Sequence, residues 1–110
     1  MKFARLSKRA QRDLELIREY ISRDNPEAAE AVWLALLATA DLLAQNVEAG
    51  TLVRNAPPRH ADVRWFVAPQ FRNYLIFYRP SRDSILVMRI LHAKQDWTRF
   101  FGSSRGEPGS

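Results

Sequence analysis

Each of the two most apolar runs of this chain, residues 74–79 and 84–92, carries an arginine: Arg79 ends the first, and Arg89 lies within the second. A short polar stretch, residues 80–83, separates the runs, so together they predict a β-hairpin. An arginine that leaves an apolar strand presents a planar guanidinium, which can bind phosphate or carboxylate through two parallel hydrogen bonds. The hairpin therefore points to recognition of an anionic or acidic partner.

The same residue types could cleave RNA without a metal ion. Such cleavage needs a base to activate the ribose 2′-hydroxyl, cations to stabilise the crowded phosphate, and an acid for the leaving oxygen. His92, at the end of a predicted strand, is the natural acid or base because imidazole titrates near neutral pH. The cations available for this chemistry are Arg64, Arg72, Arg79 and Arg89.

Each of these residues also has a structural interpretation. For His92 we favour a hydrogen-bonded position at the sheet edge over a catalytic role. Arg79 and Arg89 could instead tie the sheet edge through ion pairs, and we leave the two roles equally open. The acidic partners that we consider for these pairs are Asp62, Asp83 and Asp96. The aromatic residues that we expect in the core rather than in a site are Trp33, Tyr74 and Tyr78.

Length and composition favour one small domain. The chain has 110 residues, and 46% of them are hydrophobic, which is enough for one modest core. Its net charge is +5, and arginine supplies 14 of the 17 basic residues. That bias favours planar anions as partners, although a GC-rich genome would produce the same bias.

Several classes of protein are disfavoured by what the sequence lacks. It contains no cysteine and two histidines, so we expect no disulfide, no metal site and no cofactor. The first residues lack the apolar run of a signal peptide, and no stretch has the length of a membrane span. We therefore expect a cytoplasmic protein that does not associate with membranes.

Two helices are predicted in the first half of the chain. Ser7 is a good N-cap for a helix that ends near residue 24, and Asn25 with Pro26 begins a second helix that runs to about residue 45. The short joint predicts an antiparallel helical hairpin. Apolar residues at helical spacing are Ala10, Leu14, Ile17 and Ile21 on the first helix, and Ala29, Val32, Trp33, Leu36, Leu37, Ala40 and Leu43 on the second.

The predicted fold class is α+β, in the order β-α-α-β-β-β, with the helical hairpin on one face of a small, mainly antiparallel sheet. We expect the chain to remain packed through Phe101, giving one domain over residues 1–101 and a flexible tail over residues 102–110. A loop is expected over residues 46–59. The predicted strands span residues 2–6, 63–67, 72–79 and 84–92.

In this order and in many residues the chain resembles the ParE/RelE superfamily, the toxins of bacterial type II toxin–antitoxin systems, and it is most similar to the ParE branch. The resemblance covers about residues 3–96. The matching residues of the helical half are Ser7, Ala10, Asp13, Leu14, Ile17, Tyr20, Ile21, Asn25, Pro26, Ala28 and Ala29. Those of the hairpin half are Tyr74, Ile76, Tyr78, Arg79, Ile85, Val87, Arg89, Ile90, His92 and Asp96.

The resemblance implies a toxin that binds DNA gyrase, stalls it with its DNA broken and arrests growth. The resemblance also implies a cognate antitoxin, whose C-terminal segment wraps the toxin. It is compatible with a homodimer of the toxin within that complex. We expect this antitoxin segment to be acidic or amphipathic, and to add a strand or lay a helix into a groove. The candidates for binding the target or the antitoxin are Arg64, Arg72, Arg79, Arg89 and Trp97.

Two alternatives stay open. A RelE-like toxin would be an enzyme that cuts messenger RNA in the ribosomal A site, and its catalytic candidates here would be His92, Arg64, Arg72 and Arg89. Many such ribonucleases use a tyrosine near the C-terminus, whereas the last tyrosine here is Tyr78, inside a predicted core strand. We therefore expect a binding protein rather than an enzyme. The second alternative is a superfamily member that has lost toxicity and binds a partner.

Overall fold

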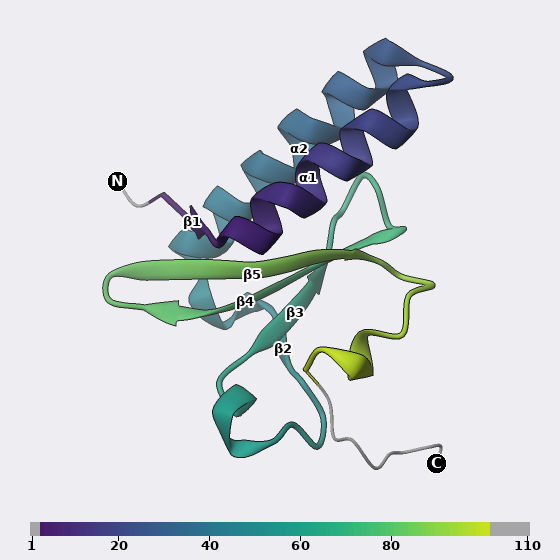
Figure 1. Ribbon diagram of the computed structural model, residues 1–110. Helices are drawn as coiled ribbons and strands as arrows, with labels where there is room; N and C mark the ends of the chain where they lie inside the picture. The colour runs from purple at the N-terminus through teal and green to yellow at the C-terminus, as the bar shows by residue number, and fades with distance from the viewer. Residues whose placement is uncertain (1–2, 102–110) are drawn as a thin grey trace.

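Two helices pack on a five-stranded sheet in the computed structural model, which describes residues 3–101 (Figure 1). The sheet order is β1-β5-β4-β3-β2, and neighbours are antiparallel except β1, which is parallel to β5. The predicted α+β fold is confirmed, while the predicted tail over residues 102–110 lies outside the described residues. The elements are β1 (Arg5–Leu6), α1 (Lys8–Ser22), α2 (Pro26–Gln45), β2 (Thr51–Leu52), β3 (Arg64–Val67), β4 (Tyr74–Ser81) and β5 (Ser84–His92).

Local sequence determines where both helices begin. The Ser7 hydroxyl accepts a hydrogen bond from the Ala10 N–H at 3.0 Å, and the Asn25 side chain accepts one from the Ala28 N–H at 3.0 Å. Each bond satisfies a backbone donor that the first turn of a helix leaves unpaired. Pro26 occupies the first turn of α2, where its missing N–H costs nothing. Within residues 3–101, neither helix combines the length and the apolar content needed to span a membrane.

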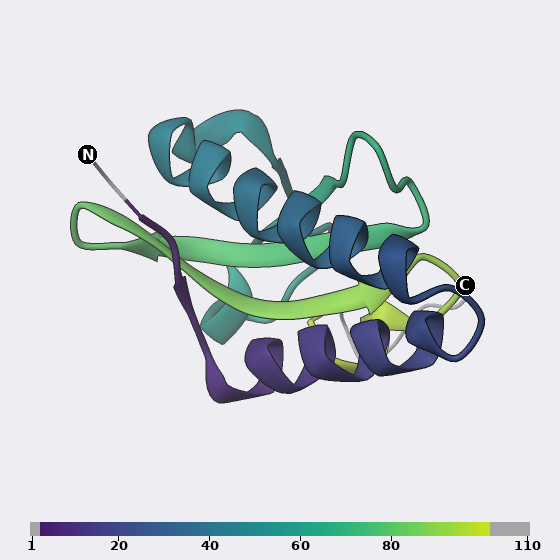
Figure 2. The ribbon, with the colours of Figure 1, turned by 90° about the horizontal axis from the view of Figure 1, so that it is seen from above.

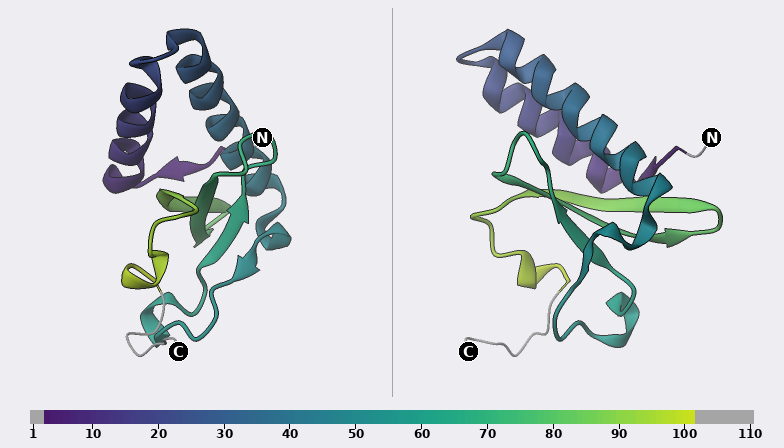
Figure 3. Two further views of the ribbon diagram at one scale, coloured as in Figure 1. Left: turned by 90° about the vertical axis from the view of Figure 1, so that its right-hand side faces the viewer. Right: turned by 180° about the vertical axis from the view of Figure 1, so that it is seen from behind.

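The helical hairpin covers one face of the sheet (Figures 2 and 3). A second core lies on the other face. β4 contributes to both cores: Ile76 and Tyr78 pack toward the helices, whereas Leu75 and Phe77 pack on the opposite side. This arrangement explains why the sequence of β4 is apolar at successive positions. The second core is closed by the loop before β3 and by the segment after β5, whose buried or half-buried side chains include Val53, Val63, Trp97, Phe100 and Phe101.

Several strand predictions needed correction. The strand predicted over residues 2–6 is β1 at Arg5–Leu6, and the one predicted over residues 63–67 begins at Arg64. The loop predicted over residues 46–59 contains β2, a strand of two exposed residues that is too short to show an alternating pattern. β4 begins at Tyr74 rather than at residue 72, and it continues past Pro80 to Ser81. Proline is tolerated there because it lies in the last ladder pairs before the turn, opposite Ile85.

Gly50 anchors the chain after α2 to the sheet. Its N–H donates to the Tyr78 hydroxyl at 2.8 Å, its carbonyl accepts from Arg64 at 2.7 Å, and the Tyr78 hydroxyl donates in turn to the Val47 carbonyl at 2.8 Å. A Cβ atom on Gly50 would lie 2.6 Å from that hydroxyl and 2.9 Å from the Trp65 carbonyl oxygen. There is no room for a side chain here.

We therefore expect Gly50→Ala to lower the free energy of unfolding by about 1–3 kcal/mol, because the added methyl group must displace backbone as well as a buried side chain. Urea unfolding followed by circular dichroism measures this change. Ala49→Ser, at the exposed neighbouring residue, is the control and should unfold like the parent chain. Equal stability of the Gly50→Ala variant and the parent would contradict the close approach of Tyr78.

Candidate functional site

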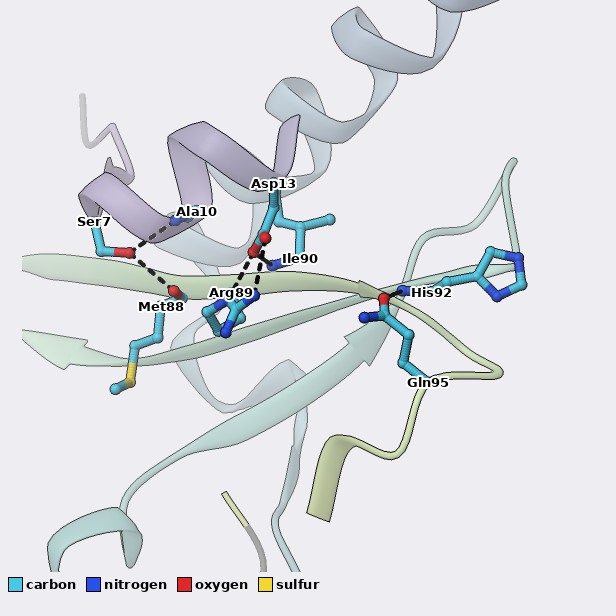
Figure 4. Close-up of polar contacts among 8 residues, drawn as sticks. All are labelled: Ser7, Ala10, Asp13, Met88, Arg89, Ile90, His92 and Gln95. Carbon is cyan, nitrogen blue, oxygen red and sulfur yellow. Dashed lines mark hydrogen bonds and ion pairs between the residues drawn. The ribbon is translucent and has the colours of Figure 1, made fainter. Parts of the chain in front are cut away.

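The outer edge of β5 is closed by side chains rather than by a full-length strand (Figure 4). β1 pairs only with Leu86 and Val87, and beyond them a register shift leaves Met88 without a counterpart in β4. The Ser7 hydroxyl donates to the Met88 carbonyl at 2.8 Å, the Asp13 carboxylate accepts from the Ile90 N–H at 2.9 Å, and the Gln95 side chain accepts from the His92 N–H at 2.7 Å. Capping of this kind protects an edge from further strand pairing.

An ion pair between Asp13 and Arg89 fixes α1 against this edge. The guanidinium donates to both carboxylate oxygens, at 2.8 and 3.0 Å, and the two side chains are only 11% and 16% exposed. The guanidinium also lies 4.4 Å above the centre of the Phe100 ring. Arg89 is therefore held by α1 on one side and by the segment after β5 on the other.

A cationic hollow of about 370 Å³ lies on one side of Arg89. Its lining includes the exposed cations Lys8, Arg9 and Arg99 and the half-buried side chains of Met88 and Phe100. The first turn of α1 contains no acidic residue, so these cations add to the positive end of the helix dipole. This arrangement favours an anionic ligand at the cost of some helix stability.

The aromatic rings of the cationic hollow are engaged within the protein. Phe101 stacks on Phe77 at 4.6 Å, and the Arg89 guanidinium covers Phe100. His60 and Phe101 form a T-shaped pair with ring centroids 5.3 Å apart, and burial, reinforced by the charge of Arg59, lowers the pKa of His60, which favours the neutral ring. Bases of a nucleic acid find little free ring surface here, so the hollow is better suited to carboxylates and apolar side chains.

An aromatic hollow of about 580 Å³ lies on the other side of Arg89. Leu16 and Tyr20 of α1 line it and are 44% and 69% exposed. Opposite them, Tyr74 meets His92 edge to face at 5.4 Å, and burial, with a further contribution from Tyr20, raises the pKa of Tyr74. The two hollows and the Asp13–Arg89 pair between them form one surface, which we call the β5-edge groove.

His92 makes a local structural contact at the end of this groove. Its ring nitrogen Nδ1 accepts a hydrogen bond from the Lys94 N–H at 3.1 Å, and its own backbone N–H is capped by Gln95. Arg89, one of the predicted cations, shares the aromatic hollow with His92. Within residues 3–101, no three His, Asp or Glu side chains lie close enough together to hold a metal ion.

The other candidate residues lie apart from one another. Arg64 donates to the Gly50 carbonyl, and Arg79 pairs with Asp62 at 2.8 Å, one of the partners that the sequence suggested. The suggested acidic partners of Arg89 were wrong, because α1 crosses the β5 edge and supplies Asp13 instead. Arg72 is exposed and makes no side-chain hydrogen bond or ion pair within residues 3–101. Trp97 is half-buried in the second core, 5.9 Å from Phe77.

Comparison with known proteins agrees with this architecture. A chain of a solved structure, the chromosomal ParDE toxin–antitoxin (TA) system from P. aeruginosa, superposes with a TM-score of 0.67 at 21% identity, over 84% of this chain and 96% of that chain. A Sinorhizobium fredii protein that bears the name "Putative toxin Y4kP" is 35% identical over 89 residues, which are 81% of this chain and 85% of that protein. Residues 4–97 match the model of a family described as the ParE toxin of the type II toxin–antitoxin system, parDE. Because that match runs from just before β1 to the turn after β5, it includes both helices and the whole sheet, and the chain belongs to the ParE toxin family.

Proposed function

We propose that this chain arrests growth by binding DNA gyrase in the cytoplasm, without catalysis of its own, and that a cognate antitoxin neutralises it. Membership of the ParE family supplies the toxin–antitoxin context. One observation favours a binding function over RNA cleavage: most of the candidate catalytic cations already bind structural partners within the protein. Arg64, Arg79 and Arg89 each hold a different structural partner, so they do not converge on a phosphate beside His92.

The β5-edge groove is the surface that we propose for the antitoxin segment. Its cationic hollow complements acidic side chains, and its aromatic hollow offers Leu16 and Tyr20 to apolar ones. Asp13 and Gln95 already cap the backbone donors of Ile90 and His92, so an incoming strand would have to displace them. A helix or an extended segment laid along the groove therefore fits better than a strand added to this edge.

His92→Ala should leave growth arrest and inhibition of purified gyrase within about threefold of the parent chain, whereas loss of a general acid or base costs about a hundredfold or more. Arg72→Glu should weaken inhibition more, by roughly tenfold, because charge reversal opposes binding to an acidic or anionic target. Supercoiling assays with purified gyrase and growth curves measure both variants. Arg54→Glu, with the same charge change on another exposed loop, is the matched control.

Arg89→Glu is less informative, because it would place two carboxylates together beside Asp13 and confuse binding with folding. A folded His92→Ala variant that no longer arrests growth, together with a parent chain that leaves gyrase active, would favour a RelE-like ribonuclease. A folded parent chain that neither arrests growth nor inhibits gyrase would favour a partner-binding member of the family without toxicity.

A further inference from the structure

Helix α2 is apolar on the side turned away from the sheet as well as on the side packed against it. Between Glu30 and Gln45 its one charged residue is Asp41, whose carboxylate accepts a hydrogen bond from the Ala4 N–H at 2.9 Å. Leu34 and Leu42 are nevertheless 59% and 52% exposed. A helix that is apolar all round is normally buried, yet one side of α2 is open in Figure 2.

Three exposed side chains of α2 and one half-buried side chain form a regular ridge. Leu34, Ala38 and Leu42 are spaced four residues apart, with Ala35 beside them, and we call these four residues the α2 outer face. Ridges of this spacing pack into each other when two helices cross at about −50°. The ridge has a small residue at its centre and a leucine on either side, so it is complementary to an antiparallel copy of itself.

A hollow of about 320 Å³ lies next to the α2 outer face. It is formed between α2 and the turn that follows β3, and its lining residues include Ala35, Leu42, Pro69 and Phe71. In an antiparallel crossing centred on Ala38, Leu34 of one copy approaches Leu42 of the other. The hollow beside Leu42 of one copy can then receive the Leu34 side chain of the other copy.

We propose that the α2 outer face is the interface of a homodimer in which two α2 helices cross at Ala38 on a two-fold axis. The face carries no charge, so it does not attract an acidic antitoxin segment or a nucleic acid. The small central residue between two leucines is what favours a second copy of the same face as its partner. In the antiparallel arrangement Glu30 of one copy approaches the C-terminal end of the partner helix rather than its acidic end. A single helix crossing buries less than the roughly 800 Å² per partner of a standard interface, so we expect dissociation in the micromolar range.

Sedimentation equilibrium of the full-length chain between about 1 and 100 µM should detect the dimer. Leu34→Glu and Leu42→Glu should each raise the dissociation constant by at least about tenfold, because every substitution enters an isologous interface twice. Leu52→Glu is the matched control: Leu52 is 48% exposed on β2, and its variant should dimerise like the parent. A monomeric parent throughout this range, or equal loss of dimer in the Leu52→Glu variant, would overturn the proposal.

The geometry of the crossing has a separate test, because the chain contains no cysteine. At an interaxial distance of about 8–10 Å, the two Cα atoms of residue 38 lie within about 6 Å, which a disulfide can bridge. Ala38→Cys should therefore form a covalent dimer under mild oxidation, whereas Ala31→Cys, two turns away on the exposed side, should not. Equal cross-linking of both variants would contradict a crossing at Ala38, even if the chain is dimeric.

Discussion

Leu36→Ala should lower the free energy of unfolding by about 2–5 kcal/mol and abolish growth arrest through loss of the folded chain. Leu36 is 0% exposed and packs in the core between the helical hairpin and the sheet. Truncation there removes apolar contacts and leaves a cavity that the neighbouring helix and strands cannot fill completely. A domain of this size has a total stability of only about 5–15 kcal/mol, so one such loss is a large part of it. Urea unfolding followed by circular dichroism measures the change.

Leu34→Ala is the matched control, because the same substitution two residues away removes a side chain that is 59% exposed. It should change the stability by less than about 0.5 kcal/mol. Both measurements should be made at low micromolar concentration or below, where self-association contributes little. Equal stability loss in the two variants, or none in Leu36→Ala, would mean that the inner face of α2 is misassigned.

The helices could be predicted because their signals are local. Ser7 and Asn25 cap the two helices with bonds that span three residues, and Pro26 fits the first turn whatever the rest of the chain does. The central strand was visible for a related reason, since residues buried on both faces leave an unbroken apolar run. β2 has no such signal: its two exposed residues are recruited by pairing with β3.

The contacts of the site depend on pairings that are distant in sequence. Arg79 and Asp62 are 17 residues apart and belong to neighbouring strand ends, so their pairing could be suggested from the order of the strands. Arg89 and Asp13 are 76 residues apart, and their contact depends on how α1 lies across β5. The register shift at Met88 also affects which backbone groups face outward. No residue type in the sequence indicates the position of this shift.

The cationic hollow could be predicted in part. Lys8 and Arg9 fall in the first turn of a helix that lacks an acidic residue there, and this unfavourable placement is readable in the sequence. Arg99 joins them only because the segment after β5 folds back along the sheet edge. The arginines that the sequence singled out lie on or near strands, and three of them, Arg64, Arg79 and Arg89, are engaged in structural contacts.

Asp13→Ala should destabilise the fold by about 3–5 kcal/mol, because it leaves the Arg89 charge without its partner in a site that is mostly shielded from water. The Arg89 side chain is 16% exposed, and the Ile90 N–H would also lose its acceptor. Asp13→Asn keeps an oxygen for that N–H and should lose less. Removing one member of a buried ion pair destabilises a protein by more than the intact pair stabilises it. Most of this cost comes from the buried charge that is left without a partner.

A double-mutant cycle followed by urea unfolding separates the stabilisation that the ion pair provides from the cost of leaving one buried charge unpaired. Asp13→Leu combined with Arg89→Met replaces both charges with apolar groups, and it should recover most of the stability that Asp13→Leu loses alone. Arg12→Ala is the surface control: Arg12 and Glu15 are 3.8 Å apart but 70% and 61% exposed, so its loss should change stability by about 0.5 kcal/mol or less. If Asp13→Ala costs no more than Arg12→Ala, the Asp13–Arg89 pair does not hold α1 on the β5 edge, and the groove that we assign to the antitoxin has no fixed wall.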